Sequence, residues 1–185
     1  MLANSLTGGF GTEDKKSLKE SIIHALKGGY RLIDTAQYYQ VEDVVGEAVR
    51  ESGVPRSEIT IITKFWGNWH HNPGEALRIS LESMKLDYID IFLMHWPFAQ
   101  TPDGKPLRIH QSPTYVETWQ LMEKLIGPTC HGIGVSNFSQ KTLDKILEIA
   151  SVVPSVNQVE LHAFNPGLKL VPYCQSRGIH VMSWR

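Results

Sequence analysis

Short apolar runs alternate with longer amphipathic stretches along almost the whole chain. The runs have the length and β-branched content of strands, and the stretches between them repeat apolar residues at helical spacing. The pattern predicts strands at residues 7–11, 31–34, 59–64, 89–95, 132–136, 156–160 and 180–184. Strands that alternate with helices in this way indicate a parallel sheet.

Three of the intervening stretches carry clear helix signals. The stretch at 13–29 places its apolar residues on one face and ends at a pair of glycines. A second helix is expected to open on Pro73 with Asn72 as its cap, and Ser139 is expected to cap a third. The longest irregular stretch, 96–113, is expected to be a functional or mobile loop.

Polar groups at the strand ends help to choose the fold. A run of βα units folds as an open doubly wound sheet or as a closed (β/α)8 TIM barrel, whose site collects residues from the C-terminal ends of many strands. Such residues follow the predicted strands here: Asp34, Lys64, His95, Ser136, Asn137 and Gln158. An open dinucleotide-binding sheet would need G-x-G-x-x-G after its first strand, and GGFGTED lacks the third glycine. We therefore expect a TIM barrel.

Composition narrows the class of partner. The 185 residues are 42% hydrophobic, which suits one domain spanning 1–185, and the net charge of −1 gives no reason to expect nucleic acid or a membrane surface. Cys130 and Cys174 lie far apart, and signal-peptide and membrane-span patterns are lacking, so we expect core thiols in a cytoplasmic protein. His70 and His71 are adjacent rather than spaced for one metal ion, and we expect surface histidines and no metal site. A small molecule is the expected partner.

The strand-end residues suit acid–base chemistry. Asp34 and Lys64 would each bury a charge alone, and together they neutralise one another; a purely structural ion pair is the alternative interpretation. Tyr39 lies five residues after Asp34, and an ammonium nearby is expected to lower its pKa, making it a proton donor near neutral pH. Together with His95 as an orienting hydrogen-bond partner, these three residues could protonate a carbonyl oxygen. Reduction of that carbonyl group would also require a hydride for its carbon atom.

The segments GYRLIDTAQYY, TKFW, IDIFLMHWP, GIGVSNFS and VNQVELHAFNP resemble successive signatures of the aldo-keto reductases, over nearly the whole chain. That family folds as a (β/α)8 barrel and reduces aldehydes and ketones with NADPH through an Asp, Tyr, Lys and His tetrad. The resemblance implies that Asp34, Tyr39, Lys64 and His95 are catalytic, with NADPH/NADP as the cofactor and a carbonyl compound as the substrate. TKFWGNWHH and MHWPFA are most similar to the aldose and glycerol reductase branch, which implies small polyhydroxylated or simple aldehydes.

The same resemblance assigns a floor for the cofactor. Ser136, Asn137 and Gln158 would hydrogen-bond the nicotinamide carboxamide, and Gly11 and Thr12 would approach it from the first strand.

Three tryptophans complete the site that the resemblance implies. Trp184 falls where the family places an aromatic residue against the nicotinamide, and core packing is an equal alternative. Trp66 and Trp96 follow the residues matched to the catalytic Lys and His and would form apolar walls of the substrate pocket, with ordinary rim packing as the alternative.

The chain departs from the family at its end. It stops after the seventh predicted strand, so we expect an incomplete barrel, truncated at the C-terminus, that lacks the eighth strand and the last helices. Open edges would favour association over the monomer usual in the family, and folding would be marginal. The family's basic segment for the 2′-phosphate of NADPH is also absent, so weak cofactor binding is expected. The alternative function is a catalytically weak or inactive fragment that acts as an interaction or regulatory module.

Overall fold

Six parallel strands, paired in sequence order, make up the sheet of the described residues, 14–184, in this computed structural model. The strands are β1 (Leu32–Asp34), β2 (Thr60–Phe65), β3 (Ile91–Met94), β4 (Ile133–Ser136), β5 (Val156–Glu160) and β6 (His180–Trp184). The helices are α1 (Lys15–Lys27), α2 (Glu42–Glu51), α3 (Pro73–Met84), α4 (Tyr115–Glu123), α5 (Gln140–Leu147) and α6 (Leu170–Ser176). Short 3-10 turns are η1 (Gln37–Tyr39), η2 (Arg56–Glu58) and η3 (Gly67–Trp69).

Most of the predicted elements are confirmed. Each of these six strands lies within two residues of its predicted bounds, and the predicted strand at 7–11 lies outside the described residues. The predicted caps are also present, because the Asn72 side chain accepts from the Glu75 N–H and the Ser139 side chain from the Thr142 N–H. The stretch 96–113 contains no helix or strand, as expected for the long loop before α4.

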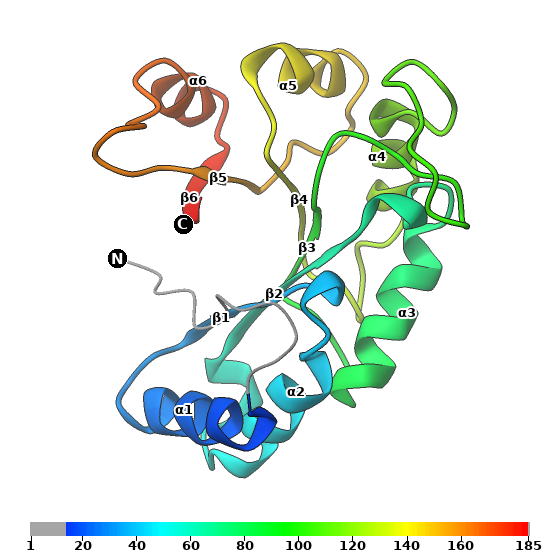
Figure 1. The fold of residues 1–185 in the computed structure, drawn as a ribbon. Helices are drawn as coiled ribbons and strands as arrows, with labels where there is room; N and C mark the ends of the chain where they lie inside the picture. The colour runs from blue at the N-terminus through cyan, green and yellow to red at the C-terminus, as the bar shows by residue number, and fades with distance from the viewer. Residues whose placement is uncertain (1–13, 185) are drawn as a thin grey trace.

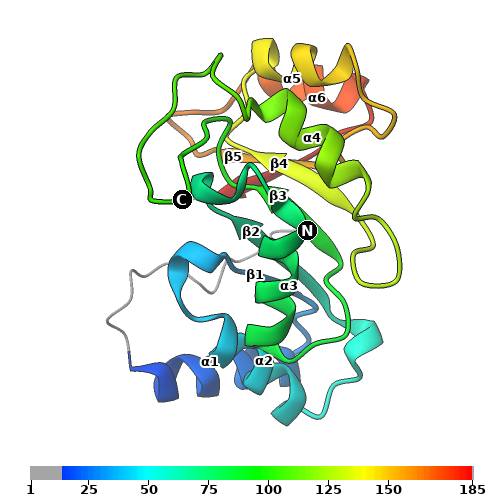
Figure 2. The same cartoon turned by 90° about the vertical axis from the view of Figure 1, so that its right-hand side faces the viewer.

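The sheet curls into a half-barrel with the helices on its outer face (Figures 1 and 2). Strand order β1 to β6 follows the sequence without a reversal, whereas a doubly wound sheet reverses its order at a switch point. The expectation of an incomplete (β/α)8 barrel is therefore confirmed. None of the helices in residues 14–184 combines the length and the apolar character needed to cross a bilayer.

Two apolar cores pack against the two faces of the sheet. The larger lies between the sheet and the helices, and both cysteines, Cys130 and Cys174, are buried in it as free thiols, as expected. The smaller lies inside the curl and consists of Ile62, Leu93, Val156 and Met182. Together the two cores supply most of the buried apolar surface that stabilises the fold.

A polar layer lies directly above the inner core. Side chains alternate between the two faces of a strand, so a residue two positions after an inner apolar residue points into the curl as well. The inner-facing residues at this level are Asp34, Lys64, His95, Ser136, Gln158 and Trp184. The strand period thus gathers six residues from six different segments at one end of the half-barrel.

Candidate active site

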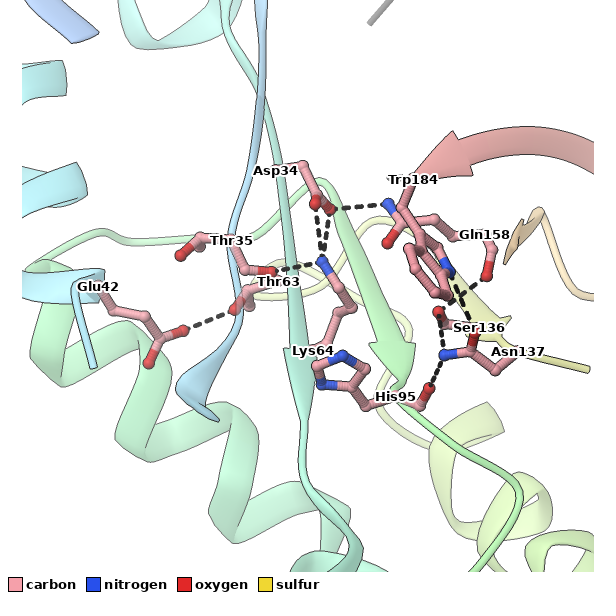
Figure 3. A network of polar contacts seen from close by, with 10 residues as sticks. All are labelled: Asp34, Thr35, Glu42, Thr63, Lys64, His95, Ser136, Asn137, Gln158 and Trp184. Carbon is pink, nitrogen blue, oxygen red and sulfur yellow. Dashed lines mark hydrogen bonds and ion pairs between the residues drawn. The ribbon is translucent and has the colours of Figure 1, made fainter. Parts of the chain in front are cut away.

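Lys64 is the most completely hydrogen-bonded charge at this end of the half-barrel (Figure 3). Its Nζ lies 2.7 and 2.8 Å from the two carboxylate oxygens of Asp34 and 2.8 Å from the carbonyl oxygen of Thr35. These three acceptors match the three protons of an ammonium. Burial lowers the pKa of Lys64, and the Asp34 carboxylate opposes that shift. The predicted ion pair is confirmed.

Tyr39 lies beside this pair, but the expected effect of Lys64 on its pKa is wrong. The ammonium of Lys64 lies 5.3 Å from the centroid of the Tyr39 ring and donates its hydrogen bonds to Asp34 and Thr35 instead. Burial, followed by the negative charge of Asp34, raises the pKa of Tyr39 to about 12. The phenol is protonated at neutral pH, as an unperturbed phenol also is, and the shift of its pKa is upward rather than downward as expected.

His95 is a neutral imidazole in this environment. Burial, followed by the charge of Lys64, lowers its pKa to about 3. Its ring meets the Tyr39 ring edge to face, with centroids 5.9 Å apart. Within residues 14–184, the buried Nδ1 of His95 has no hydrogen-bond partner. A neutral ring beside a protonated phenol can hold a polar oxygen without bringing a second charge.

Ser136, Asn137 and Gln158 form one network with the ion pair (Figure 3). The Asn137 Nδ2 donates to the His95 carbonyl oxygen at 2.9 Å and to Ser136 Oγ at 3.1 Å. Ser136 Oγ donates to the Gln158 carbonyl oxygen, and Gln158 Nε2 donates to Asp34 Oδ1 at 2.9 Å. The structure therefore brings together the residues predicted to be catalytic and the residues predicted to form the floor.

The backbone conformation at Asn137 sets the direction of its side chain in this network. Asn137 has a φ of 65°, in the left-handed region, which asparagine tolerates better than most residues. Its N–H donates to the Gln158 carbonyl oxygen at 2.8 Å, which extends the pairing of β4 and β5 by one residue. The left-handed turn then directs the side chain toward His95.

Trp184 closes one side of this end of the half-barrel. Its half-buried indole Nε1 donates to Asn137 Oδ1 at 3.0 Å. Trp184, Asn137 and Trp96 line a cavity of about 700 Å³, together with the 160–170 loop. The cavity is within the range of small-molecule sites.

Trp66 forms a second aromatic wall near His95. It stacks on Tyr38 with ring centroids 4.1 Å apart, and its edge-to-face contact with His95 has a centroid separation of 5.1 Å. Tyr38, the neighbour of Tyr39, is exposed and packs on Trp66. Two of the predicted site residues, Gly11 and Thr12, lie outside the described residues.

His70 corrects a prediction about the histidine pair. His71 is exposed as expected, but His70 is fully buried, with its Nδ1 3.1 Å from Thr118 Oγ1. Burial lowers the pKa of His70 to about 4. A polar side chain was not expected in the packing between η3 and α4. No group of three metal-ligating side chains occurs within the described part of the chain.

A buried acid that was not predicted from the sequence lies close to the site. Glu42 is almost fully buried, and Thr63 Oγ1 donates to its Oε1 at 2.6 Å (Figure 3). The sequence does contain a signal, because Glu42 lies on the same helical stripe as Val45 and Val49, which are core residues. An acid on an apolar stripe needs a buried partner.

Sequence and structure comparisons point to one family. The Aldo/keto reductase family matches residues 3–185 of the chain. The chain belongs to this family. Among related proteins, the glycerol 2-dehydrogenase (NADP(+)) of Saccharomyces cerevisiae is 39% identical over 197 residues, which cover 95% of this chain and 63% of the yeast protein.

Solved aldo-keto reductases share its fold. The Bombyx mori aldo-keto reductase in complex with NADP aligns with a TM-score of 0.88 and 35% identity, over 99% of this chain and 61% of that one. The aldose reductase of Giardia lamblia aligns with a TM-score of 0.85 and 31% identity, over 95% of this chain and 64% of that one. This aldo-keto reductase chain spans less than two thirds of the length of each of these relatives. The family resemblance seen in the sequence, including the aldose and glycerol reductase branch, is confirmed.

Proposed function

We propose that this chain carries the site for NADPH-dependent reduction of aldehydes and ketones to alcohols. The observation that carries the proposal is the protonated Tyr39 beside neutral His95 and the buried Lys64–Asp34 pair, at one end of the half-barrel. Membership of the aldo-keto reductases and the NADP complex of the silkworm relative support it. When bound, NADPH supplies a hydride to the carbonyl carbon and leaves as NADP+.

Tyr39 is the proposed proton donor to the carbonyl oxygen. A phenol with a pKa of about 12 holds its proton at neutral pH and releases it only to a strong base, which the oxygen becomes as hydride reaches its carbon. His95, neutral and nearly buried, is the proposed hydrogen-bond partner that orients the same oxygen. Lys64 and Asp34 would keep a compensated charge pair beneath the phenol, which stabilises the reacting dipole without adding net charge.

The floor fits a nicotinamide carboxamide by its pattern of donors and acceptors. Both protons of Asn137 Nδ2 and the hydroxyl proton of Ser136 are used within the network, and Gln158 gives a proton to Asp34. The side-chain oxygen of Asn137 accepts from Trp184 Nε1 and keeps a second lone pair, and the side-chain oxygen of Gln158 is a further acceptor, so the floor suits a ligand that donates from an NH2 group. Ser136, Asn137 and Gln158 are therefore the proposed carboxamide partners.

The other cofactor contacts rest on the family resemblance. Trp184 is the proposed stacking partner of the nicotinamide ring, and its half-buried position beside Asn137 supports that role. Gly11 and Thr12 are proposed to approach the cofactor from the N-terminal side.

The substrate is proposed to be a small aldehyde or ketone. Trp66 lies against His95, and Trp96 lines the cavity beside Asn137, so both could form apolar walls around a carbonyl group. The similarity to a glycerol 2-dehydrogenase favours a small polyhydroxylated substrate.

A titration followed by a turnover assay tests the proposal. NADPH is added to the purified chain while tryptophan fluorescence is recorded, and glyceraldehyde is then added while the near-ultraviolet absorbance of NADPH is followed. We expect saturable quenching and turnover, and Tyr39→Phe should abolish turnover while leaving the quenching curve in place. Because the pKa of Tyr39 is about 12, kcat should show no loss from ionisation of Tyr39 between neutral pH and about pH 10. Turnover that survives Tyr39→Phe would contradict the assigned role.

A non-catalytic interaction module is the second candidate, and the sheet edges favour it. Within residues 14–184, β1 and β6 are the outer strands of the sheet, and a strand edge can pair with another chain. A folded chain that forms dimers and neither binds NADPH nor consumes it would support this candidate over the reductase.

A further inference from the structure

The turn that carries Tyr38 and Tyr39 is held on its outer side by hydrogen bonds at both of its ends. Gln37 opens the turn, and its Nε2 donates to the Ala76 carbonyl oxygen at 2.7 Å and to Ser80 Oγ at 3.0 Å, both on α3. Glu42 follows the turn as the first residue of α2 and is bonded by Thr63 on β2.

Buried polar side chains make the contacts at both ends of the turn. Thr63 and Ser80 are completely buried and Glu42 nearly so, and a buried hydroxyl or carboxyl must find its partners within the protein. Burial raises the pKa of the Glu42 carboxyl, and hydrogen bonds from Thr63 and Ser80 oppose the rise. One end of the turn is therefore bonded through Gln37 to Ser80 on α3, and the other end through Glu42 to Thr63 on β2.

The hydrogen bond to Glu42 comes from the strand that holds Lys64. Thr63 and Lys64 are neighbours on β2, so their side chains point to opposite faces of the sheet. Thr63 reaches outward to Glu42, while Lys64 reaches inward to Asp34, as Figure 3 shows. One strand thus sets both the place of the ammonium and the place of the turn with the tyrosines.

We propose that Glu42 and Gln37 are positioning residues that hold Tyr39 over Lys64 through Thr63 and Ser80. The catalytic consequence rests on the role proposed above for Tyr39. Hydrogen bonds are directional, so these contacts fix the turn in one place, which packing of apolar side chains of equal volume would not do. The carboxyl acts as an acceptor for Thr63, and that role needs an oxygen atom rather than a negative charge.

A series of variants tests whether Glu42 acts as a hydrogen-bond acceptor or through a negative charge. Glu42→Gln keeps an oxygen for Thr63, Glu42→Leu removes it, and Thr63→Val removes the donor at nearly constant volume. Glu47→Gln and Glu47→Leu are the matched controls, because Glu47 is an exposed acid on the same helix.

The first readout is carbonyl reduction. We expect Glu42→Leu and Thr63→Val to lower kcat about tenfold or more, since a misplacement of about 1 Å can cost about a hundredfold, while the KM for NADPH changes less than about twofold. Glu42→Gln should stay within about twofold of the unchanged chain in kcat, as should both controls at Glu47.

The second readout does not depend on activity. Trp66 stacks on Tyr38 in the same turn, so release of the turn should make Trp66 more accessible to acrylamide quenching. Subtraction of the signal of matched Trp66→Phe proteins isolates this residue. We expect greater accessibility in Glu42→Leu and Thr63→Val and no change in Glu42→Gln.

The outcomes separate this proposal from the proposed function. Should the unchanged chain not reduce carbonyls, the proposed function fails and the quenching data alone decide the positioning role. If Glu42→Leu does not fold, Thr63→Val takes its place. A folded Thr63→Val with unchanged Trp66 accessibility and, in an active chain, unchanged kcat would overturn the positioning role. A loss of kcat in Glu42→Gln equal to that in Glu42→Leu would overturn it in favour of an electrostatic one.

Discussion

Gln158 on β5 donates its side-chain amide to Oδ1 of Asp34 on β1, across 2.9 Å and a separation of 124 residues. Both side chains are buried in the polar layer of the half-barrel. Asp34 therefore accepts hydrogen bonds from Lys64 and from Gln158 at the same time. The ion pair and the proposed cofactor floor are one polar unit, so a change at either is expected to affect the other.

Loss of Lys64 should destabilise the fold, because the buried Asp34 carboxylate then lacks its positively charged partner. In Lys64→Met the Asp34 carboxylate keeps its place in the protein interior without its cation, and we expect the free energy of unfolding to fall by about 3–5 kcal/mol. Urea unfolding at neutral pH measures the change. The double variant Lys64→Met with Asp34→Leu should recover much of the loss, since neither charge then remains.

The matched control for this pair lies on the surface. Lys15 and Asp43 are 2.7 Å apart but both are exposed, so Lys15→Met should cost less than about 1 kcal/mol. Equal losses in Lys15→Met and Lys64→Met would show that burial of the Asp34 charge has no energetic consequence here.

Gly46→Ala tests a close approach of two helices. Alanine favours a helix interior over glycine by up to about 1 kcal/mol, but a Cβ at Gly46 would lie 1.9 Å from the Met84 carbonyl oxygen. That contact is with backbone, so α2 must move away from α3, and we expect a net loss of about 1–3 kcal/mol in thermal or urea unfolding. Gly127→Ala is the control, because a Cβ there meets no atom within 4 Å. A stabilised Gly46→Ala would mean that helix propensity outweighs the contact.

Acid should destabilise the fold through its buried histidines. The pKa of His70 is about 4 in the folded chain, below the value of 6.5 for a free side chain, so folding favours the neutral ring. The resulting stability is fully present above about pH 6.5 and is lost as the pH falls toward 4, a change of about 3 kcal/mol. His95, with a pKa of about 3, adds to the same trend.

One variant isolates the contribution of His70. His70→Gln retains a polar partner for Thr118 and cannot take up a proton, so its unfolding free energy should fall less steeply between pH 6.5 and 4 than that of the unchanged chain. Identical slopes in the two proteins would exclude His70 as a source of acid sensitivity.

The sequence by itself determined the order of the elements and the contents of the polar layer. Strand and helix periods are local properties, and residues two positions apart on a strand share a face whatever the fold. Once the strands at 31–34 and 59–64 were placed, Asp34 and Lys64 had to reach the same end of a parallel sheet. The caps at Asn72 and Ser139 are equally local, because each bonds a backbone N–H three residues away.

Only the tertiary structure decided how the charges act on one another. The pKa of Tyr39 rises because the phenol is buried and lies near the negative charge of Asp34, and spacing along the chain contains neither its burial nor that distance. The burial of His70 and the contact between Glu42 and Thr63 likewise depend on which helix packs on which strand. Electrostatic energies vary with distance, orientation and exposure in three dimensions, so the sequence predicts which groups meet and the packing sets the sign of their effect.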